Sequence, residues 1–239
     1  MDEPLLSELK SISVKSSHEY YLDKWLGLYE YDDYKRWLFS GIVKILKKYV
    51  RNGIVLEIGC SRGYLSELVN REGYFCIGGD ISITALRSVR NKNQVMRLDG
   101  ETLPFKNASF DAVLAINSLE HMPQPQKVLK EVFRVLRNDG LFLGITPDKG
   151  SLLGKFGSRL VTYTSLKNPY HVGLMNKKEM NTSLDNAGFK SLAVLPFHNG
   201  FLGAPLVSKI SKREFIMIPI NICFLVPFSH HQLVIALKS

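Results

Sequence analysis

The sequence predicts one doubly wound α/β domain, in which helices cover both faces of a mostly parallel sheet. Short apolar, β-branched runs alternate with amphipathic helical patterns between residues 54 and 145. Alternation of this kind is typical of parallel strands joined by right-handed helical crossovers. The 239 residues suffice for one such domain with a core that needs no disulfide bonds.

The first 53 residues predict a helical segment ahead of the sheet. Residues 18–37 are rich in aromatic side chains, and apolar residues recur at helical spacing up to Tyr49, before Asn52-Gly53. The aromatic side chains have two interpretations: they pack a helix onto the sheet, or they form a lid with ring faces toward a bound ligand. The candidates for such a lid are Tyr20, Tyr21 and Tyr29.

Strands and helices then alternate to residue 148, and this segment (54–148) is the predicted ligand-binding core. Its buried strands are predicted at 54–58, 74–79, 94–98, 110–117 and 141–145. Its helices are predicted at 63–71, at 82–91, and over the apolar stripe from residue 128 to the stop signal Asn138-Asp139-Gly140.

The remaining segment, 149–239, is predicted to form a substrate-side insertion and the last strands of the same domain. Residues 148–175 have little periodicity, and 199–230 is a long connection of the kind that is usually functional or disordered. Asn176, followed by Glu179, is a capping pair for a helix that ends at Gly188. The last two strands are predicted at 191–195 and 233–237.

The first two strand–helix units carry a nucleoside-binding pattern. The strand at 54–58 runs into the small-residue turn 59–63, and a helix follows at once. Asp80 closes the next strand, where a carboxylate can bind both hydroxyls of a ribose. A dinucleotide fingerprint needs a third glycine, and Tyr64 stands there instead. The pattern therefore favours an amino-acid-bearing nucleoside over a dinucleotide.

Four motifs in order resemble the class I S-adenosylmethionine-dependent methyltransferases, and most of all their type 11 group. The motifs are VLEIGCSRG (55–63), GGDIS (78–82), LDGETLPFKNASFDAVLAINSLEHM (98–122) and LRNDGLFLGITPD (136–148). This resemblance implies a Rossmann-like fold with a seven-stranded, mostly parallel sheet and an antiparallel last strand. It also implies S-adenosylmethionine as the cofactor and S-adenosylhomocysteine as the product. The substrate is left open, because this fold serves many acceptors.

The resemblance implies a role for each matching residue. The methionine portion of the cofactor is expected to contact Glu57, Gly59, Cys60, Ser61 and Gly63. The ribose is expected at Asp80 and the adenine at Ile81, with the adenine amino group at Asp99 beside Gly100 and Glu101. The sulfonium and the acceptor are expected to border Asn117, Ser118 and Leu119. Ser61 stands where the family usually has its middle glycine, which leaves the cofactor somewhat less room.

Methyl transfer needs few catalytic side chains, because alignment of the acceptor behind a reactive sulfonium supplies much of the rate. A base is needed only where the acceptor must lose a proton. His121 is the first candidate for that base, and a structural loop histidine is the alternative interpretation. His171 is the second candidate, whereas His230-His231 is predicted to be the polar start of the last strand.

No metal site is predicted, because no Cys/His cluster has the spacing of zinc ligands and the three cysteines, Cys60, Cys76 and Cys223, are far apart. This cysteine usage suits a reducing compartment. The acidic N-terminus lacks a signal peptide's basic and apolar regions. The protein is therefore expected to be cytoplasmic.

The C-terminal third carries most of the net charge of +9, since residues 151–239 hold 10 Lys/Arg against 3 Asp/Glu. Within it, the basic residues Lys209, Lys212 and Arg213 precede the apolar run 215–228. This run either packs under the sheet edge or meets a membrane surface or a lipid chain. We therefore expect methylation, at oxygen or carbon, of a small-molecule or lipid-like acceptor that can be anionic, with peripheral membrane contact through 209–228.

Two other functions stay open from the sequence. One is a non-catalytic S-adenosylmethionine-binding regulatory or scaffold protein. The other is an RNA or protein methyltransferase, although the Asn/Asp-Pro-Pro-Tyr motif of amino-group methylation is absent and only the basic third favours nucleic acid. The oligomeric state is expected to be a monomer or a homodimer.

Overall fold

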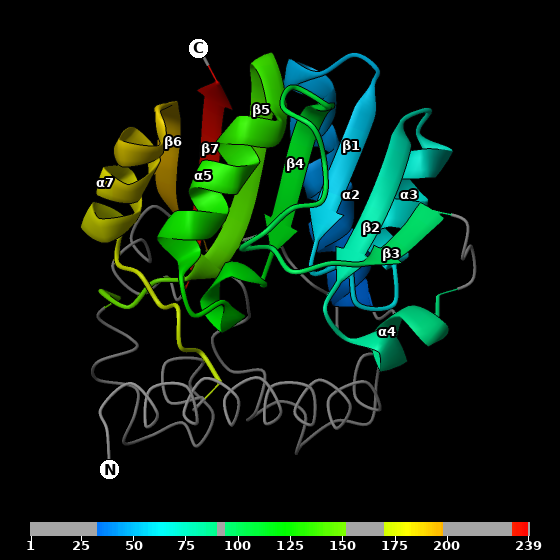
Figure 1. Ribbon diagram of the computed structural model, residues 1–239, viewed down its shortest axis with the longest axis horizontal. Coiled ribbons are helices and arrows are strands. Elements are labelled where there is room, and N and C mark those ends of the chain that lie inside the picture. The colour runs from blue at the N-terminus through cyan, green and yellow to red at the C-terminus, as the bar shows by residue number, and fades with distance from the viewer. Residues whose placement is uncertain (1–32, 90–93, 152–169, 198–230, 239) are drawn as a thin grey trace.

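The computed structural model describes residues 33–89, 94–151, 170–197 and 231–238. They form one seven-stranded sheet in the order β3-β2-β1-β4-β5-β7-β6 (Figure 1). All neighbouring strands are parallel except β7, which runs antiparallel to both β5 and β6. The strands are β1 (Ile54–Ile58), β2 (Phe75–Asp80), β3 (Val95–Arg97), β4 (Phe110–Ile116), β5 (Leu136–Pro147), β6 (Phe189–Phe197) and β7 (His231–Lys238). The predicted fold class, including the antiparallel last strand, is confirmed.

Helices cover both faces of the sheet, as the alternating pattern predicts. In Figure 1, α5 (Pro125–Val135) and α7 (Lys177–Ala187) lie in front of the sheet, and α2 (Asp33–Tyr49) and α3 (Tyr64–Arg71) lie behind it. Each face has its own apolar core. The front core joins α5 and α7 to the sheet through Val128, Leu129, Met180 and Leu184. The rear core joins α2 and α3 to the other face through Leu38, Ile42, Leu46, Leu65 and Val69.

The carboxyl ends of the parallel strands lie along one edge, the lower edge of the sheet in Figure 1. The short helices α4 (Ile83–Arg87) and η2 (Leu119–His121) lie at this edge, after β2 and β4 respectively. Ligands of open α/β sheets bind beyond the carboxyl ends of the strands. The fold therefore places the predicted site at this edge.

Two of the predicted helices differ in length from the observed ones. The helix predicted to run to Asn138-Asp139-Gly140 ends at Val135, because Leu136 is already extended and pairs with Phe110. The turn signal instead marks an irregularity within β5, where Asp139 has a φ of 60°. The helix predicted over 82–91 is the shorter α4.

The capping pair ahead of the last helix is confirmed. The Asn176 side chain accepts the backbone N–H of Glu179, and the Glu179 side chain accepts the N–H of Asn176. Gly188 ends α7 with a φ of 99°, in the left-handed region that favours glycine. A Cβ there would lie 2.9 Å from the ring of Phe133, so the helix end is also tightly packed on α5.

Three predictions fall wholly or mostly on residues outside the described ranges: the tyrosine lid at 20–29, the weakly periodic stretch 148–175 and the basic, apolar stretch at 209–228. The division into segments at 53 and 148 stays a prediction. Among the described residues, no helix is both long enough and apolar enough to cross a membrane.

Candidate active site

The turn after β1 is held closely against the ends of the neighbouring strands. Gly59, Ser61 and Gly63 all have positive φ, at 80°, 49° and 72°. A Cβ on Gly59 would lie 2.5 Å from the Cβ of Ser118, which follows β4. Only glycine fits at position 59, whereas Ser61 holds a conformation that disfavours any side chain. The strain at Ser61 is therefore a second consequence of the missing glycine, besides the reduced room.

The first backbone N–H groups of this turn are engaged within the protein. Gly59 and Cys60 both donate to the carbonyl oxygen of Gly79, at 2.7 and 3.0 Å. Ser61 donates to the carboxylate of Asp80 at 2.8 Å. The turn therefore offers a ligand close approach to its backbone, rather than these three N–H donors.

Asp80 lies at the carboxyl end of β2, where the sequence predicts it, and is only 6% exposed. One carboxylate oxygen accepts the N–H of Ser61, and the other accepts the N–H of Ser82 at 2.9 Å. Burial raises the pKa of Asp80, and these backbone hydrogen bonds act against that rise. A carboxylate offers about four acceptor positions. The positions that the backbone N–H groups do not occupy suit the pair of hydroxyls of a ribose.

Glu57 is the buried carboxyl on the cofactor side of the site. It lies in β1 with 5% of its surface exposed, and one of its oxygens accepts the hydroxyl of Ser66. Burial raises the pKa of Glu57 to about 8, although the bond from Ser66 lowers it. Most Glu57 carboxyls are therefore protonated at neutral pH. A ligand that brings positive charge would favour the ionised form.

The loop after β3 brings the predicted adenine-side residues together. Asp99 accepts the N–H of Glu101 at 3.0 Å and so closes a local turn. A Cβ on Gly100 would lie 3.1 Å from the side chain of Ile58 at the end of β1. The Glu101 carboxylate accepts the backbone N–H of Gln124 at 2.9 Å, so both the N–H and the side chain of Glu101 are engaged within the protein. Ile81, directly after Asp80, is half-buried at the same edge.

After β4 the chain leaves two buried polar atoms unsatisfied. Asn117 Oδ1 and Ser118 Oγ have no hydrogen-bond partner among the described residues. Asn117 has a φ of 51°, and its N–H is bonded to the carbonyl of Ile145 at 2.7 Å. Buried polar atoms without a partner are costly, so these two fit a site that a polar ligand completes. Leu119 has its side chain fully buried in the front core, so only its backbone can border such a ligand.

The candidate acceptor side contains three titratable side chains, from Glu120, His121 and His171. Their ligand atoms all lie within 4.8 Å of one another. The two imidazole rings meet edge to face, with centroids 4.7 Å apart. Both histidines are half-buried, whereas Glu120 is 2% exposed and accepts the hydroxyl of Thr146 at 3.0 Å. Burial raises the pKa of Glu120 to about 8.

The tautomer of neutral His121 follows from its hydrogen bond. Its Nδ1 lies 3.2 Å from the backbone carbonyl oxygen of Tyr170. A carbonyl oxygen only accepts, so Nδ1 carries the proton and Nε2 keeps the lone pair. His121 therefore has the form required of a proton acceptor or of a metal ligand.

Both predicted histidines thus come together, although 50 positions separate them in the sequence. Glu120 is not among the residues predicted for the site, because ligand-spacing rules describe side chains that are near in sequence. The available signal was the Glu-His pair directly after a buried strand. Its third member cannot be located without the fold.

The fold and the residues at this edge are those expected of an α/β protein that binds a nucleoside beyond the ends of β1, β2 and β4. Comparison with known proteins supplies the family. Residues 56–144 match the family model described as a methyltransferase domain. The chain is 30% identical, over 182 residues, to an uncharacterized protein of Methanocaldococcus jannaschii, covering 74% of this chain and 80% of that protein. The chain belongs to the S-adenosylmethionine-dependent methyltransferases.

Two further comparisons agree with this assignment. A probable S-adenosylmethionine-dependent methyltransferase of Mycobacterium tuberculosis is 29% identical over 153 residues, which cover 61% of this chain. Only about half of that relative, 52%, is matched. The crystal structure of a putative methyltransferase from Bacillus halodurans shares the fold, with a TM-score of 0.61 at 17% identity. It covers 83% of this chain and 99% of that one. The family resemblance and the fold class are therefore confirmed.

Proposed function

We propose that this protein transfers the methyl group of S-adenosylmethionine to an oxygen or carbon of a small-molecule or lipid-like acceptor. The observation that carries the proposal is the placement of two functions at one edge. Asp80 is bonded to the turn that contains Gly59, and that turn packs against Ser118. The N–H of His121, whose ring contacts His171, donates to the Ser118 carbonyl at 3.1 Å. The bound cofactor supplies an electrophilic methyl group, and the protein supplies binding, alignment and a place for a proton.

His121 is our candidate for the general base. In its neutral form the lone pair is on Nε2, because the Tyr170 carbonyl holds the proton on Nδ1. An acceptor hydroxyl would pass its proton to Nε2 as its oxygen forms the bond to the methyl group, and the S–CH3 electron pair stays on sulfur. His171 packs edge-on against His121 and limits the orientations of that ring.

The acceptor class is proposed from charge and hydropathy rather than from a pocket. The basic C-terminal third favours an anionic acceptor or an anionic membrane surface. The basic and apolar stretch 209–228 is the proposed site of peripheral membrane contact. It lies outside the described residues, so its part in the proposal rests on the sequence alone. The cytoplasmic location stays an expectation of the same kind.

Thermal unfolding with added ligand tests the cofactor. We expect S-adenosylmethionine and S-adenosylhomocysteine to raise the unfolding temperature and NAD to leave it unchanged. At 100 times the dissociation constant, a ligand stabilises by about 2.7 kcal/mol. Asp80→Ala should abolish the rise, whereas Asp185→Ala on the exposed surface of α7 should retain it. No rise with either adenosyl compound would overturn the proposed cofactor.

Turnover distinguishes an enzyme from a non-catalytic binding protein. Release of S-adenosylhomocysteine should be measured across hydroxylated, enolisable and lipid-like acceptors, with short RNA included as a competitor class. Methylation of at least one small acceptor supports the proposal. Cofactor binding without turnover on any of them would favour a regulatory role, and a steep salt dependence with RNA would favour a nucleic-acid substrate.

A further inference from the structure

Glu120, His121 and His171, here called the EHH cluster, combine three potential metal ligands on the acceptor side of the site. Glu120 and His121 lie in η2 after β4, and His171 lies in the segment that leads to α7. Their ligand atoms lie within 4.8 Å of one another. No other group of three His, Cys, Asp or Glu side chains with this proximity occurs in the part of the chain that the structure describes.

Backbone contacts hold the two halves of the EHH cluster together. The N–H of Gly173 donates to the carbonyl of Glu120 at 2.9 Å, and the carbonyl of Tyr170 meets His121 Nδ1 at 3.2 Å. A Cβ on Gly173 would lie only 2.2 Å from the carbonyl oxygen of Met122. The segment from Tyr170 is therefore fitted directly onto η2, with glycine at the closest point.

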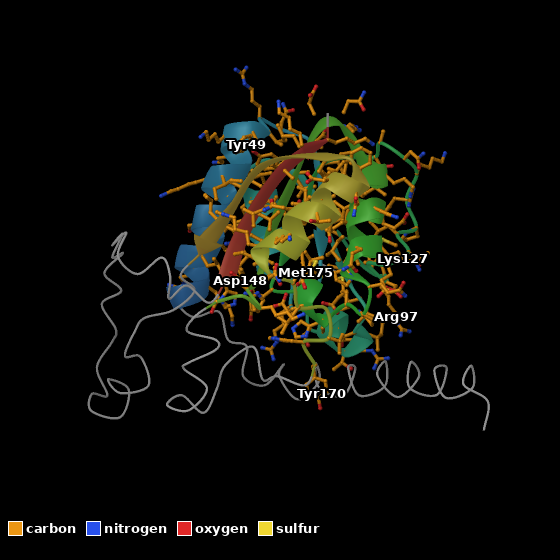
Figure 2. All side chains as sticks on the ribbon, turned by 90° about the vertical axis from the view of Figure 1, so that its left-hand side faces the viewer. Tyr49, Arg97, Lys127, Asp148, Tyr170 and Met175 are labelled. Carbon is orange, nitrogen blue, oxygen red and sulfur yellow. The ribbon has the colours of Figure 1, made fainter. Side chains whose placement is uncertain are left out.

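A second anchor fixes the same segment to the sheet. Met175 forms a bridge with Asp148 at the end of β5, and the Gln232 side chain donates to the Met175 carbonyl at 3.0 Å. Figure 2 shows Asp148 and Met175 side by side at the lower end of the sheet, with Tyr170 below them. His171 is thus presented to His121 by a segment that is anchored on both sides of it.

The donor types and their outer partners are those of a metal site. One carboxylate and two imidazoles form a set typical of divalent transition metals, and imidazole is a poor ligand for Mg²⁺ or Ca²⁺. Metal-bound histidines usually donate their second ring N–H to a carbonyl or carboxylate, as His121 does to Tyr170. The carboxylate is also oriented, by the hydroxyl of Thr146. Two of the three donors therefore have the supporting contacts that ligands need.

We propose that the EHH cluster binds a first-row divalent transition-metal ion, of the Zn²⁺, Co²⁺ or Mn²⁺ kind. When each ligand atom lies about 2.1 Å from the metal ion, neighbouring ligand atoms are roughly 3.0–3.4 Å apart. The widest separation in the cluster must therefore contract by about 1.5 Å, which small χ rotations of the two half-buried histidines can supply. The ionised carboxylate of buried Glu120 would provide the negative charge that holds the ion.

The ion also specifies the acceptor, and this step rests on the proposed methyltransferase function. A divalent ion lowers the pKa of an oxygen ligand. The acceptor class that fits is therefore a molecule with a hydroxyl placed beside the EHH cluster. With an ion bound, the Nε2 lone pair of His121 is shared with the metal, so His121 serves as a ligand and no longer as the base.

Cobalt binding tests the site without any methyl transfer. Untagged, full-length protein, freed of metal with a chelator, is titrated with Co²⁺ while its visible d–d absorption is recorded. We expect one equivalent to bind, with an absorption band that Zn²⁺ displaces and Mg²⁺ does not. Glu120→Gln and His171→Gln should each weaken binding by at least about tenfold, since even outer partners cost that much. The matched controls Glu72→Gln and His231→Gln should bind as the unchanged protein does.

Stabilisation by S-adenosylhomocysteine separates the two proposals. Each variant should keep this stabilisation, which also shows that it folds. Stoichiometric Co²⁺ binding lost only in the cluster variants supports the metal site. Absence of the band, or equal binding by cluster and control variants, overturns the metal site. In that case, methyl transfer that persists in the presence of a chelator still supports the proposed function. Metal binding without any adenosyl-ligand stabilisation would instead overturn the proposed function alone.

Discussion

The raised pKa of Glu57 predicts that the affinity for S-adenosylmethionine increases as pH rises toward 8. Burial raises the pKa of this carboxyl to about 8, so the ligand-free protein is mostly protonated there at neutral pH. The methionine portion of the ligand carries an ammonium and a sulfonium, which favour the ionised carboxylate. Binding must then expel a proton, and the affinity follows the fraction of Glu57 that is already ionised.

The size of the effect follows from that pKa. The ionised fraction of a carboxyl with a pKa of about 8 rises from ~1% at pH 6 to ~24% at pH 7.5. The association constant should therefore rise about 25-fold over this interval, or ~1.9 kcal/mol. The α-amino group of the ligand titrates near a pKa of roughly 7.7–8.0 and opposes the trend above that range. The interval from pH 6 to 7.5 is consequently the informative one.

Isothermal titration calorimetry in two buffers of different ionisation enthalpy measures this proton directly. At pH 7 we expect release of about 0.9 proton for each ligand bound. Glu57→Gln should abolish the release and flatten the pH profile, whereas Glu67→Gln, on the half-exposed face of α3, should leave both unchanged. A flat profile in the unchanged protein, or an identical slope in Glu57→Gln, would refute the reasoning.

Three further predictions concern stability. Because the folded-state pKa of Glu57 is raised, the free energy of unfolding of the ligand-free protein should fall as pH rises from 4.5 through about 8. The fall should be a few kcal/mol at most, and Glu57→Gln should remove it when unfolding by urea is measured across this pH range. Gly173→Ala should destabilise the protein by about 1–3 kcal/mol, since its Cβ would meet the Met122 carbonyl at 2.2 Å. Gly41→Ala in α2 has open space and should stabilise it by roughly 0.5–1 kcal/mol. Thermal unfolding compares the two variants, and equal effects would contradict the contact at Gly173. Ser61→Gly should relieve the backbone strain of a side chain at a φ of 49° and change the free energy of unfolding by less than about 1 kcal/mol. It should also tighten the binding of S-adenosylhomocysteine, and weaker binding in calorimetry would count against the strain argument.

The sequence predicts the core of this fold well because local and tertiary preferences agree there. The run 54–58 is apolar, β-branched and bounded by turn residues, and it is a strand buried between two others. Agreement fails at Asn138-Asp139-Gly140, where a strong local stop signal lies inside β5. The helix has already ended at Val135, and Leu136 pairs with Phe110, a long-range contact that no local pattern contains.

The candidate site divides in the same way. Asp80 could be placed from the sequence because its position follows from a strand end, and strand ends are local. The contact of His171 with His121 could not, since it depends on how the segment from Tyr170 is fitted onto η2. Leu119 is the opposite case: it follows β4 as expected, yet its side chain turns into the front core.

Glu57 and Glu120 together explain why this edge of the sheet needs ligands. Both are nearly fully buried, and each accepts one hydroxyl, from Ser66 and Thr146 respectively. One hydroxyl compensates only part of the cost of burying a carboxylate, so neither side chain is explained by stability alone. A cationic cofactor at Glu57 and a divalent ion at Glu120 would each bring a positive charge that favours the ionised carboxylate. The two proposals therefore give the two buried carboxyls the same role, which is to pair with a positively charged ligand.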